Sequence, residues 1–153
     1  MKDSGTILYA EDDERDIELT MEALAEHSLV NSVAVVRDGE EALDFLYRRG
    51  AYRERAGEDP VLVLLDIKMP KMDGIQVLRQ VKVDRRLKSI PVVMLTSSRE
   101  EKDLLESYQL GVNAYVVKPV EFEKFVEAVK QIGLFWLLLN EPPPRSRGRD
   151  GES

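Results

Sequence analysis

The sequence predicts an α/β domain in which a doubly wound sheet of five parallel strands is covered by helices on both faces. Five short runs rich in Val, Ile and Leu, at residues 6–10, 32–36, 61–65, 91–95 and 114–117, hardly alternate in polarity. Such runs are typical of strands buried on both faces. The segments between them carry apolar residues at helical spacing beside charged residues. Strand and helix therefore alternate along the chain, as in parallel sheets.

The first two helices are predicted from stripes of apolar or small residues, which follow the strands at 6–10 and 32–36. These stripes are Ile17, Met21, Leu24 and Ser28 in the first helix, and Ala42, Phe45 and Leu46 in the second. Residues 48–60 form a polar connection that is longer than most links from a helix to a strand. Part of this connection is a candidate extension of the second helix.

The third and fourth helices have recognisable ends. Asp73 is placed to cap the N-terminus of a third helix that begins at Gly74. Ser98 is placed to cap a fourth helix, and Gly111 to close it. The apolar stripe of the third helix is Ile75, Leu78 and Val81.

The last helix is predicted to begin near Glu121 and to bury Phe122, Phe125, Val126 and Val129. From about Gly133 the chain continues into residues 134–139, which are apolar all round and far too few to span a bilayer. This extension either folds back on its own domain or, as we favour, forms a subunit interface. The interface residues would be Leu134, Phe135, Trp136 and Leu138. We therefore expect one domain over residues 1–139 and a disordered tail over 140–153.

Composition narrows the class of protein. A length of 153 residues suits one domain with its own core. The net charge of −7 disfavours binding to nucleic acid or to an anionic membrane. The absence of cysteine excludes disulfides, thiolate metal sites and thiol redox chemistry. Residues 1–5 lack the pattern of a secretion signal, so we expect a cytoplasmic protein.

Charged side chains follow three of the predicted strands. The strand at 6–10 is followed by Glu11, Asp12 and Asp13, the strand at 61–65 by Asp66, and the strand at 114–117 by Lys118. If the first and third strands are neighbours, their acidic side chains meet at the sheet edge where α/β proteins bind ligands. Several ionised carboxylates need a cation there, and oxygen ligands favour Mg²⁺. The only histidine, His27, is isolated, which disfavours zinc.

A carboxylate beside Mg²⁺ and an ammonium group is a plausible nucleophile toward phosphorus, which would make Asp66 the site of an aspartyl phosphate. Lys118 and Mg²⁺ would hold the phosphoryl oxygens, and the hydroxyl of Thr96 could hydrogen-bond another. Water can attack an acyl phosphate. The modification is therefore expected to be transient.

The chain resembles the receiver domain of two-component response regulators over about residues 6–132. The resemblance rests on Ile7-Leu8-Tyr9-Ala10-Glu11-Asp12-Asp13, Leu65-Asp66-Ile67-Lys68-Met69-Pro70 with Asp73-Gly74, Met94-Leu95-Thr96-Ser97-Ser98 and Tyr115-Val116-Val117-Lys118-Pro119. It implies a flavodoxin-like (βα)5 fold with strand order 2-1-3-4-5. It also implies that Asp66 accepts a phosphoryl group from a phosphohistidine on a sensor histidine kinase.

The resemblance further implies particular ligands and switch residues. Mg²⁺ would be bound by Asp12, Asp66 and the backbone carbonyl of Lys68, and through water by Glu11. In an alternative alignment of the acidic pair, Asp13 is the ligand. Thr96 and Tyr115 would be the switch residues, with the Thr hydroxyl drawn to the phosphoryl group and the aromatic ring turning inward. The bond between Lys118 and Pro119 is expected to be cis.

A narrower resemblance rests on residues 43–50, 82–93 and 135–137. These segments look like those of small response regulators that partner phytochrome-type histidine kinases. That subgroup implies a stand-alone receiver that forms a homodimer through its C-terminal region. Similar stand-alone receivers serve other sensors, and nothing after residue 140 is expected to form a DNA-binding or enzymatic output domain.

Two rival functions are weaker on the residues. A haloacid dehalogenase-like phosphatase or phosphotransferase also uses a strand-end Asp, Mg²⁺ and Lys, but it carries a second acid where this chain has Lys68. The chain also has no cap insertion to enclose a substrate. A flavodoxin-like cofactor module is disfavoured because the loop after the first strand is acidic, where a flavin phosphate needs hydroxyls and amides. We therefore expect a phosphoacceptor that modifies only itself, and we do not expect an enzyme that acts on a separate substrate.

Overall fold

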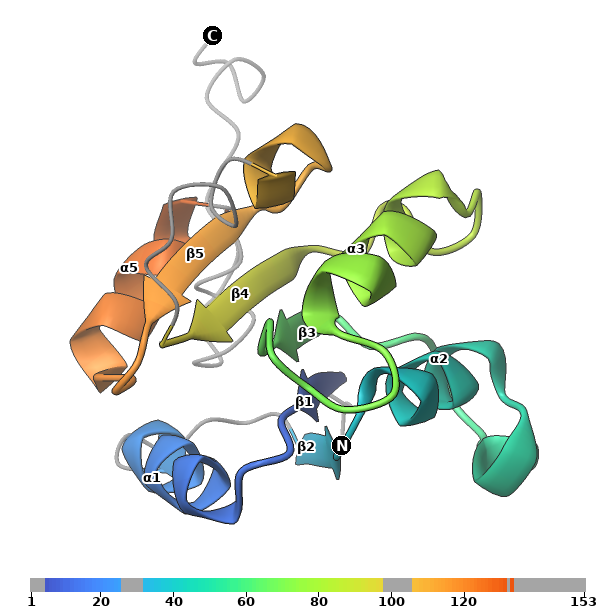
Figure 1. Ribbon diagram of the computed structural model, residues 1–153, viewed down its shortest axis with the longest axis horizontal. Coiled ribbons are helices and arrows are strands. Elements are labelled where there is room, and N and C mark those ends of the chain that lie inside the picture. The colour runs from blue at the N-terminus through green and yellow to red at the C-terminus, as the bar shows by residue number, and fades with distance from the viewer. Residues whose placement is uncertain (1–4, 26–31, 98–105, 132, 134–153) are drawn as a thin grey trace, which may run out of the picture.

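The computed structural model describes residues 5–25, 32–97, 106–131 and 133 (Figure 1). Five parallel strands form one sheet in the order β2-β1-β3-β4-β5. Their bounds are β1 Thr6–Ala10, β2 Ser32–Val36, β3 Leu62–Leu65, β4 Val92–Thr96 and β5 Ala114–Val117. The predicted flavodoxin-like topology is therefore confirmed, with each strand within one residue of its expected ends.

The helices lie on both faces of the sheet. Their bounds are α1 Glu14–Ala25, α2 Gly39–Tyr47, α3 Gly74–Val83 and α5 Phe122–Gln131. Figure 1 shows α1 and α5 on one face and α2 and α3 on the other. Residues 106–109 are helical, but the predicted start of that helix at Ser98 lies outside the described residues. None of the helices that the structure describes is long and apolar enough to cross a bilayer.

Two apolar cores hold these layers together, one on each face of the sheet. Along β1, Ile7 and Tyr9 pack in the core that includes α1 and α5, whereas Leu8 and Ala10 pack in the core that includes α2 and α3. This alternation follows from the two-residue period of a strand. Because both faces are covered, the four residues are all fully buried.

The structure corrects two details of the predicted helices. Val126 is only half-buried in α5, and Ala128 is buried with Phe122, Phe125 and Val129. The candidate extension of α2 into residues 48–60 is wrong. The helix ends at Tyr47 because Arg48 takes a left-handed conformation, with φ of 56°, and a short 3-10 helix, η1 Gly50–Tyr52, follows.

Several predictions fall outside the described residues. Ser28 and His27 belong to the segment 26–31, and the apolar segment 134–139 and the tail 140–153 follow the last described residue. The predicted interface of Leu134, Phe135, Trp136 and Leu138 and the predicted domain limits therefore stay predictions.

Candidate functional site

The pairing of β1 with β3 brings acidic side chains together at one edge of the sheet. Ala10 lies opposite Leu65, so that Glu11 and Asp66 leave their strands side by side. The backbone N–H of Asp66 donates to the carbonyl of Ala10 at 3.0 Å. Ligand oxygens of Glu11, Asp12 and Asp66 lie within 4.8 Å of one another. Glu11 and Asp66 are buried and Asp12 is exposed, so the group opens to solvent on one side.

Lys118, directly after β5, inserts its ammonium group among these carboxylates. Its Nζ lies 2.8 Å from Glu11 Oε1 and 3.2 Å from Asp66 Oδ1, and its side chain is only 8% exposed. The peptide bond between Lys118 and Pro119 is cis, as predicted. The structure therefore joins Glu11, Asp12, Asp66 and Lys118, four of the residues that the sequence singled out.

A third carboxylate that contacts the Lys118 ammonium was not predicted. Asp16 Oδ2, from the first turn of α1, lies 2.6 Å from Nζ, which makes it the shortest of the three contacts. In the sequence Asp16 is one more acid in the first turn of a helix, where acids are common because they interact favourably with the helix dipole. Only the folded structure, in which the first turn of α1 meets the residue that follows β5, reveals its partner.

Burial and charge shift the protonation of these groups. Burial raises the pKa of Glu11 from 4.5 to about 7, although the hydrogen bond from Lys118 opposes the shift. Burial likewise raises the pKa of Asp66, again opposed by Lys118. Burial disfavours the charge of Lys118, but its hydrogen bonds to Asp16 and Glu11 outweigh that cost and raise its pKa. The site is thus a desolvated group of acids that one ammonium neutralises only in part.

Asp13, the alternative ligand, has a different place. Its Oδ1 accepts the backbone N–H of Asp16 at 3.0 Å, as an N-cap of α1 does. The backbone N–H of Asp13 donates to Glu11 Oε2 at 3.2 Å. Asp13 therefore fixes the start of α1 and the orientation of Glu11, and its carboxylate is not part of the group formed by Glu11, Asp12 and Asp66.

The turn after β3 packs closely against the backbone of Asp66. Gly74 donates its N–H to the carbonyl of Ile67 at 2.9 Å, and a Cβ on Gly74 would lie 2.1 Å from the carbonyl oxygen of Asp66. Asp73 caps α3 in a capping box with Gln76, which confirms the predicted cap. Lys68, two residues after Asp66, is exposed. Asp73 and Gly74 therefore shape the turn that carries the backbone carbonyl of Lys68, the proposed metal ligand.

The predicted switch residues lie on the neighbouring strands. Thr96 is the last residue of β4, but the position of its side chain is not described. Tyr115 is half-buried in β5, and its ring stacks on that of Tyr108 with 6.4 Å between the centroids. Their switching roles stay predictions.

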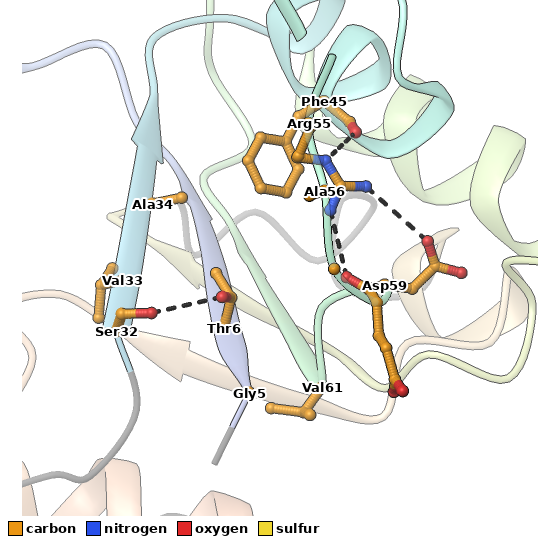
Figure 2. Close-up of a pocket in the computed structure, with 12 residues that line it drawn as sticks. Gly5, Thr6, Ser32, Val33, Ala34, Phe45, Arg55, Ala56, Asp59 and Val61 are labelled. Carbon is orange, nitrogen blue, oxygen red and sulfur yellow. Dashed lines mark hydrogen bonds and ion pairs between the residues drawn. The ribbon is translucent and has the colours of Figure 1, made fainter. Parts of the chain in front are cut away.

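A cavity of about 520 Å³ lies far from this chemistry, near the N-terminal ends of β1 and β2 (Figure 2). Thr6, Ser32 and Phe45 line it together with Arg55. The guanidinium of Arg55 donates to the carbonyls of Phe45 and Glu58 and lies 3.9 Å from Asp59. Because the strand-end acids are at the opposite edge of the sheet, we assign the functional site to the acids and not to this cavity.

The strand-end acids fit a hard divalent cation. All their donors are oxygens, and Asp12 offers an exposed carboxylate beside two buried ones. Mg²⁺ and Mn²⁺ favour such ligands and retain some of their water. A bound cation would also offset the negative charge that Lys118 leaves uncompensated.

Comparisons with known proteins find similar sequences and similar structures. The family model described as "Response regulator receiver domain" matches residues 7–130. The solved structure of the bacteriophytochrome response regulator AtBRR is 58% identical, covers 90% of this chain and 98% of its own, and gives a TM-score of 0.82.

Two further relatives are named as regulators from different organisms. Response regulator Rcp1 of Synechocystis is 39% identical over 86% of this chain and 88% of its own length. Its Mn²⁺-bound crystal structure gives a TM-score of 0.73, covering 92% of this chain and 99% of that one. The probable methanogenesis regulatory protein FilR2 of Methanothrix harundinacea is 38% identical over 93% of this chain and 90% of its own.

Proposed function

Because this chain belongs to the response regulator receiver domain family, we propose that it relays a signal by accepting a phosphoryl group on Asp66 from a sensor histidine kinase. The observation that carries the proposal is the meeting of three strand ends. Asp66 Oδ1 lies 3.2 Å from the buried Lys118 ammonium, and the oxygens of Glu11 and Asp12 lie within 4.8 Å of an Asp66 oxygen. These are the parts that phosphoryl transfer to a carboxylate needs.

The step is a displacement at phosphorus. A carboxylate oxygen of Asp66 forms the new O–P bond as the P–N bond to the kinase imidazole breaks, and the imidazole leaves with the bonding pair. Lys118 donates hydrogen bonds to the phosphoryl oxygens, and Thr96 is proposed to donate another. Water later attacks the acyl phosphate, the O–P bond breaks, and inorganic phosphate leaves as Asp66 returns to its free carboxylate. The reaction is self-modification and has no separate substrate to enclose.

We assign a Mg²⁺ site to the same acids. Asp12, Asp66 and the backbone carbonyl of Lys68 would hold the ion, with Glu11 acting through water. Mn²⁺ in the homologous Rcp1 supports this assignment. When bound, the ion supplies neutralisation of the charge on the phosphoryl oxygens.

The kinase is proposed to be a phytochrome-type sensor. The similarity to AtBRR and Rcp1 supports it, since AtBRR is named as a bacteriophytochrome response regulator. The similarity to FilR2 keeps a receiver for another sensor as the alternative. Phosphotransfer measured from each sensor kinase of the source organism in turn would identify the donor, as the cognate kinase transfers fastest.

The remaining proposals concern the conformational switch, the oligomeric state, the location in the cell and nucleic acid binding. We propose that phosphorylation draws in the Thr96 hydroxyl and turns Tyr115 inward, which changes partner binding. A homodimer through Leu134, Phe135 and neighbouring apolar residues, a cytoplasmic location and an absence of nucleic acid binding complete the proposal. The net charge of −7 supports the last of these.

Labelling with acetyl phosphate tests the central proposal. Wild-type protein is expected to gain one phosphoryl group per chain only when Mg²⁺ is present, through a bond that is stable in acid and labile in base. Asp66→Asn should not be labelled. Asp44→Asn is the matched control, because Asp44 is a partly exposed acid on α2 that pairs with Arg49. Equal labelling of Asp66→Asn and wild type would contradict the assignment.

A further inference from the structure

Lys118 has three carboxylate partners, and one of them lies outside the group that can share a metal ion. An ammonium has three N–H donors. Here Asp16 Oδ2 lies 2.6 Å, Glu11 Oε1 2.8 Å and Asp66 Oδ1 3.2 Å from Nζ. Glu11 and Asp66 belong to the acidic group with Asp12, whereas Asp16 does not. Of the three partners, Asp16 is the one outside this acidic group, and it makes the shortest contact with the ammonium.

Asp16 is itself held in place by residues around the start of α1. Its backbone N–H donates to Asp13 Oδ1 at 3.0 Å, and the buried Tyr9 hydroxyl donates to its carbonyl oxygen at 3.5 Å. Its side chain is one-third exposed, at 33%, whereas that of Lys118 is 8% exposed. The carboxylate thus stands at the mouth of the site on a fixed backbone, with the ammonium drawn toward it from the interior.

We infer that Asp16 is a positioning residue that competes with Asp66 for the Lys118 ammonium, so that the 3.2 Å contact to Asp66 stays the longest of the three and gives way when a phosphoryl group enters. A lysine side chain is long and flexible, and its place is set by its partners. Without the Asp16 carboxylate, the ammonium would be free to shorten its 3.2 Å contact with Asp66. The shorter ion pair would weaken Asp66 as a nucleophile and would be harder for the phosphoryl oxygens to displace. The inference rests on the proposed function, since it assumes that Asp66 is the phosphoacceptor.

The expected effect is on the rate of phosphorylation. In the assay, the phosphoryl group passes from acetyl phosphate to an Asp66 oxygen, and acetate leaves with the electrons of the broken P–O bond. At saturating Mg²⁺, we expect Asp16→Asn to slow this step about tenfold, less than the roughly hundredfold cost of a 1 Å misplacement, because Glu11 still holds the ammonium. Asp16→Glu keeps the charge and should recover at least half of the wild-type rate. Asp16→Ser provides a second charge-removing variant that does not depend on the folding of the first.

Two comparisons separate positioning from a general loss of charge or of structure. Glu14→Gln is the matched control, because Glu14 lies in the same helical turn but pairs with Arg37. This variant should be phosphorylated at the wild-type rate. In a Lys118→Met background, Asp16→Asn should have no further effect, because its partner is gone.

The outcomes distinguish this inference from the proposed function. If wild type is labelled on Asp66 while Asp16→Asn and Asp16→Ser are as fast as Glu14→Gln, the inference is overturned and the proposed function stands. An equal loss from Asp16→Asn with and without Lys118 would also overturn the inference. If wild type is not labelled at all, the proposed function fails first.

Discussion

Among the acids of the site, Glu11 has the pKa that the fold shifts most clearly. It is 1% exposed, and its carboxylate contacts both Lys118 and the backbone N–H of Asp13. Burial raises its pKa from 4.5 to about 7, despite these hydrogen bonds. Without a metal ion, the folded protein therefore holds a proton on Glu11 at pH values where the unfolded chain has lost it. The stability gained from this proton is complete below pH 4.5 and is lost as the pH rises through about 7.

This shift predicts that Mg²⁺ binding depends on pH. A divalent ion favours ionised carboxylates, so the Glu11 proton must leave when the ion binds. We expect the affinity for Mg²⁺ to rise between pH 6 and pH 8, with proton release that is larger at pH 6 than at pH 8. Titration calorimetry in buffers of different ionisation enthalpy measures both quantities. Glu11→Gln, which cannot release this proton, should lose most of the pH dependence, and an affinity that is constant over this range would contradict the prediction.

The position of charged residues directly after apolar strands could predict part of the site. Asp66 and Lys118 were identified because each directly follows an apolar strand, and parallel strands bring such residues to one edge. Asp16 could not be found this way, because its role depends on the first turn of α1 meeting Lys118 after the end of β5. Its sequence position fits a helix start equally well with or without a partner.

At the scale of elements, the turn between β3 and α3 couples helix geometry to the position of Asp66. The sequence predicted its cap at Asp73, since an Asp before a helical stripe is a local signal. The contact of Gly74 with the Asp66 carbonyl could not be predicted, because it depends on how the turn folds back on β3. The end of α2 at Tyr47 was also missed, because Arg48 takes a left-handed conformation that favours glycine.

Gly74→Ala is predicted to damage the site through the backbone. The new Cβ would lie 2.1 Å from the Asp66 carbonyl oxygen, so β3 or α3 must move. We expect a loss of about 1–3 kcal/mol in the free energy of unfolding, typical of overpacking, and slower labelling of Asp66. Urea unfolding and acetyl phosphate labelling measure the two effects.

Asp73→Ala serves as the contrast to Gly74→Ala. It removes the cap of α3, which should cost about 1 kcal/mol of stability, and adds no atom against Asp66. Labelling should therefore stay near the wild-type rate. If the two variants have equal effects on labelling at equal stability, the close approach of Gly74 to Asp66 is not what the site needs.

At the scale of the molecule, hydrophobic patterning was enough to predict a parallel sheet with alternating strands and helices, whereas the strand order 2-1-3-4-5 followed from the resemblance to receiver domains. Buried parallel strands give short continuous apolar runs, and amphipathic helices separate them, so that the order of the elements follows from the pattern. Residues 48–60 were not predictable because charged side chains hold them in place. Asp59 accepts two hydrogen bonds from Arg86, at 2.8 and 3.0 Å, and also lies near Arg48 and Arg55. Such contacts between distant segments leave no periodic signal.

The whole-molecule charge makes the proposed homodimer testable. Each chain carries a net charge of −7, so two copies repel one another, and apolar burial must supply the attraction. Residues 134–139 are six consecutive apolar residues that could supply it. Salt screens the repulsion and leaves apolar burial largely intact. Sedimentation equilibrium at micromolar concentration should therefore show a dimer that tightens as NaCl is raised. Phe135→Ala and Trp136→Ala should weaken it, whereas Val83→Ala, at a side chain 70% exposed on α3, should not. A monomer at every salt concentration, with and without beryllofluoride, would refute the dimer.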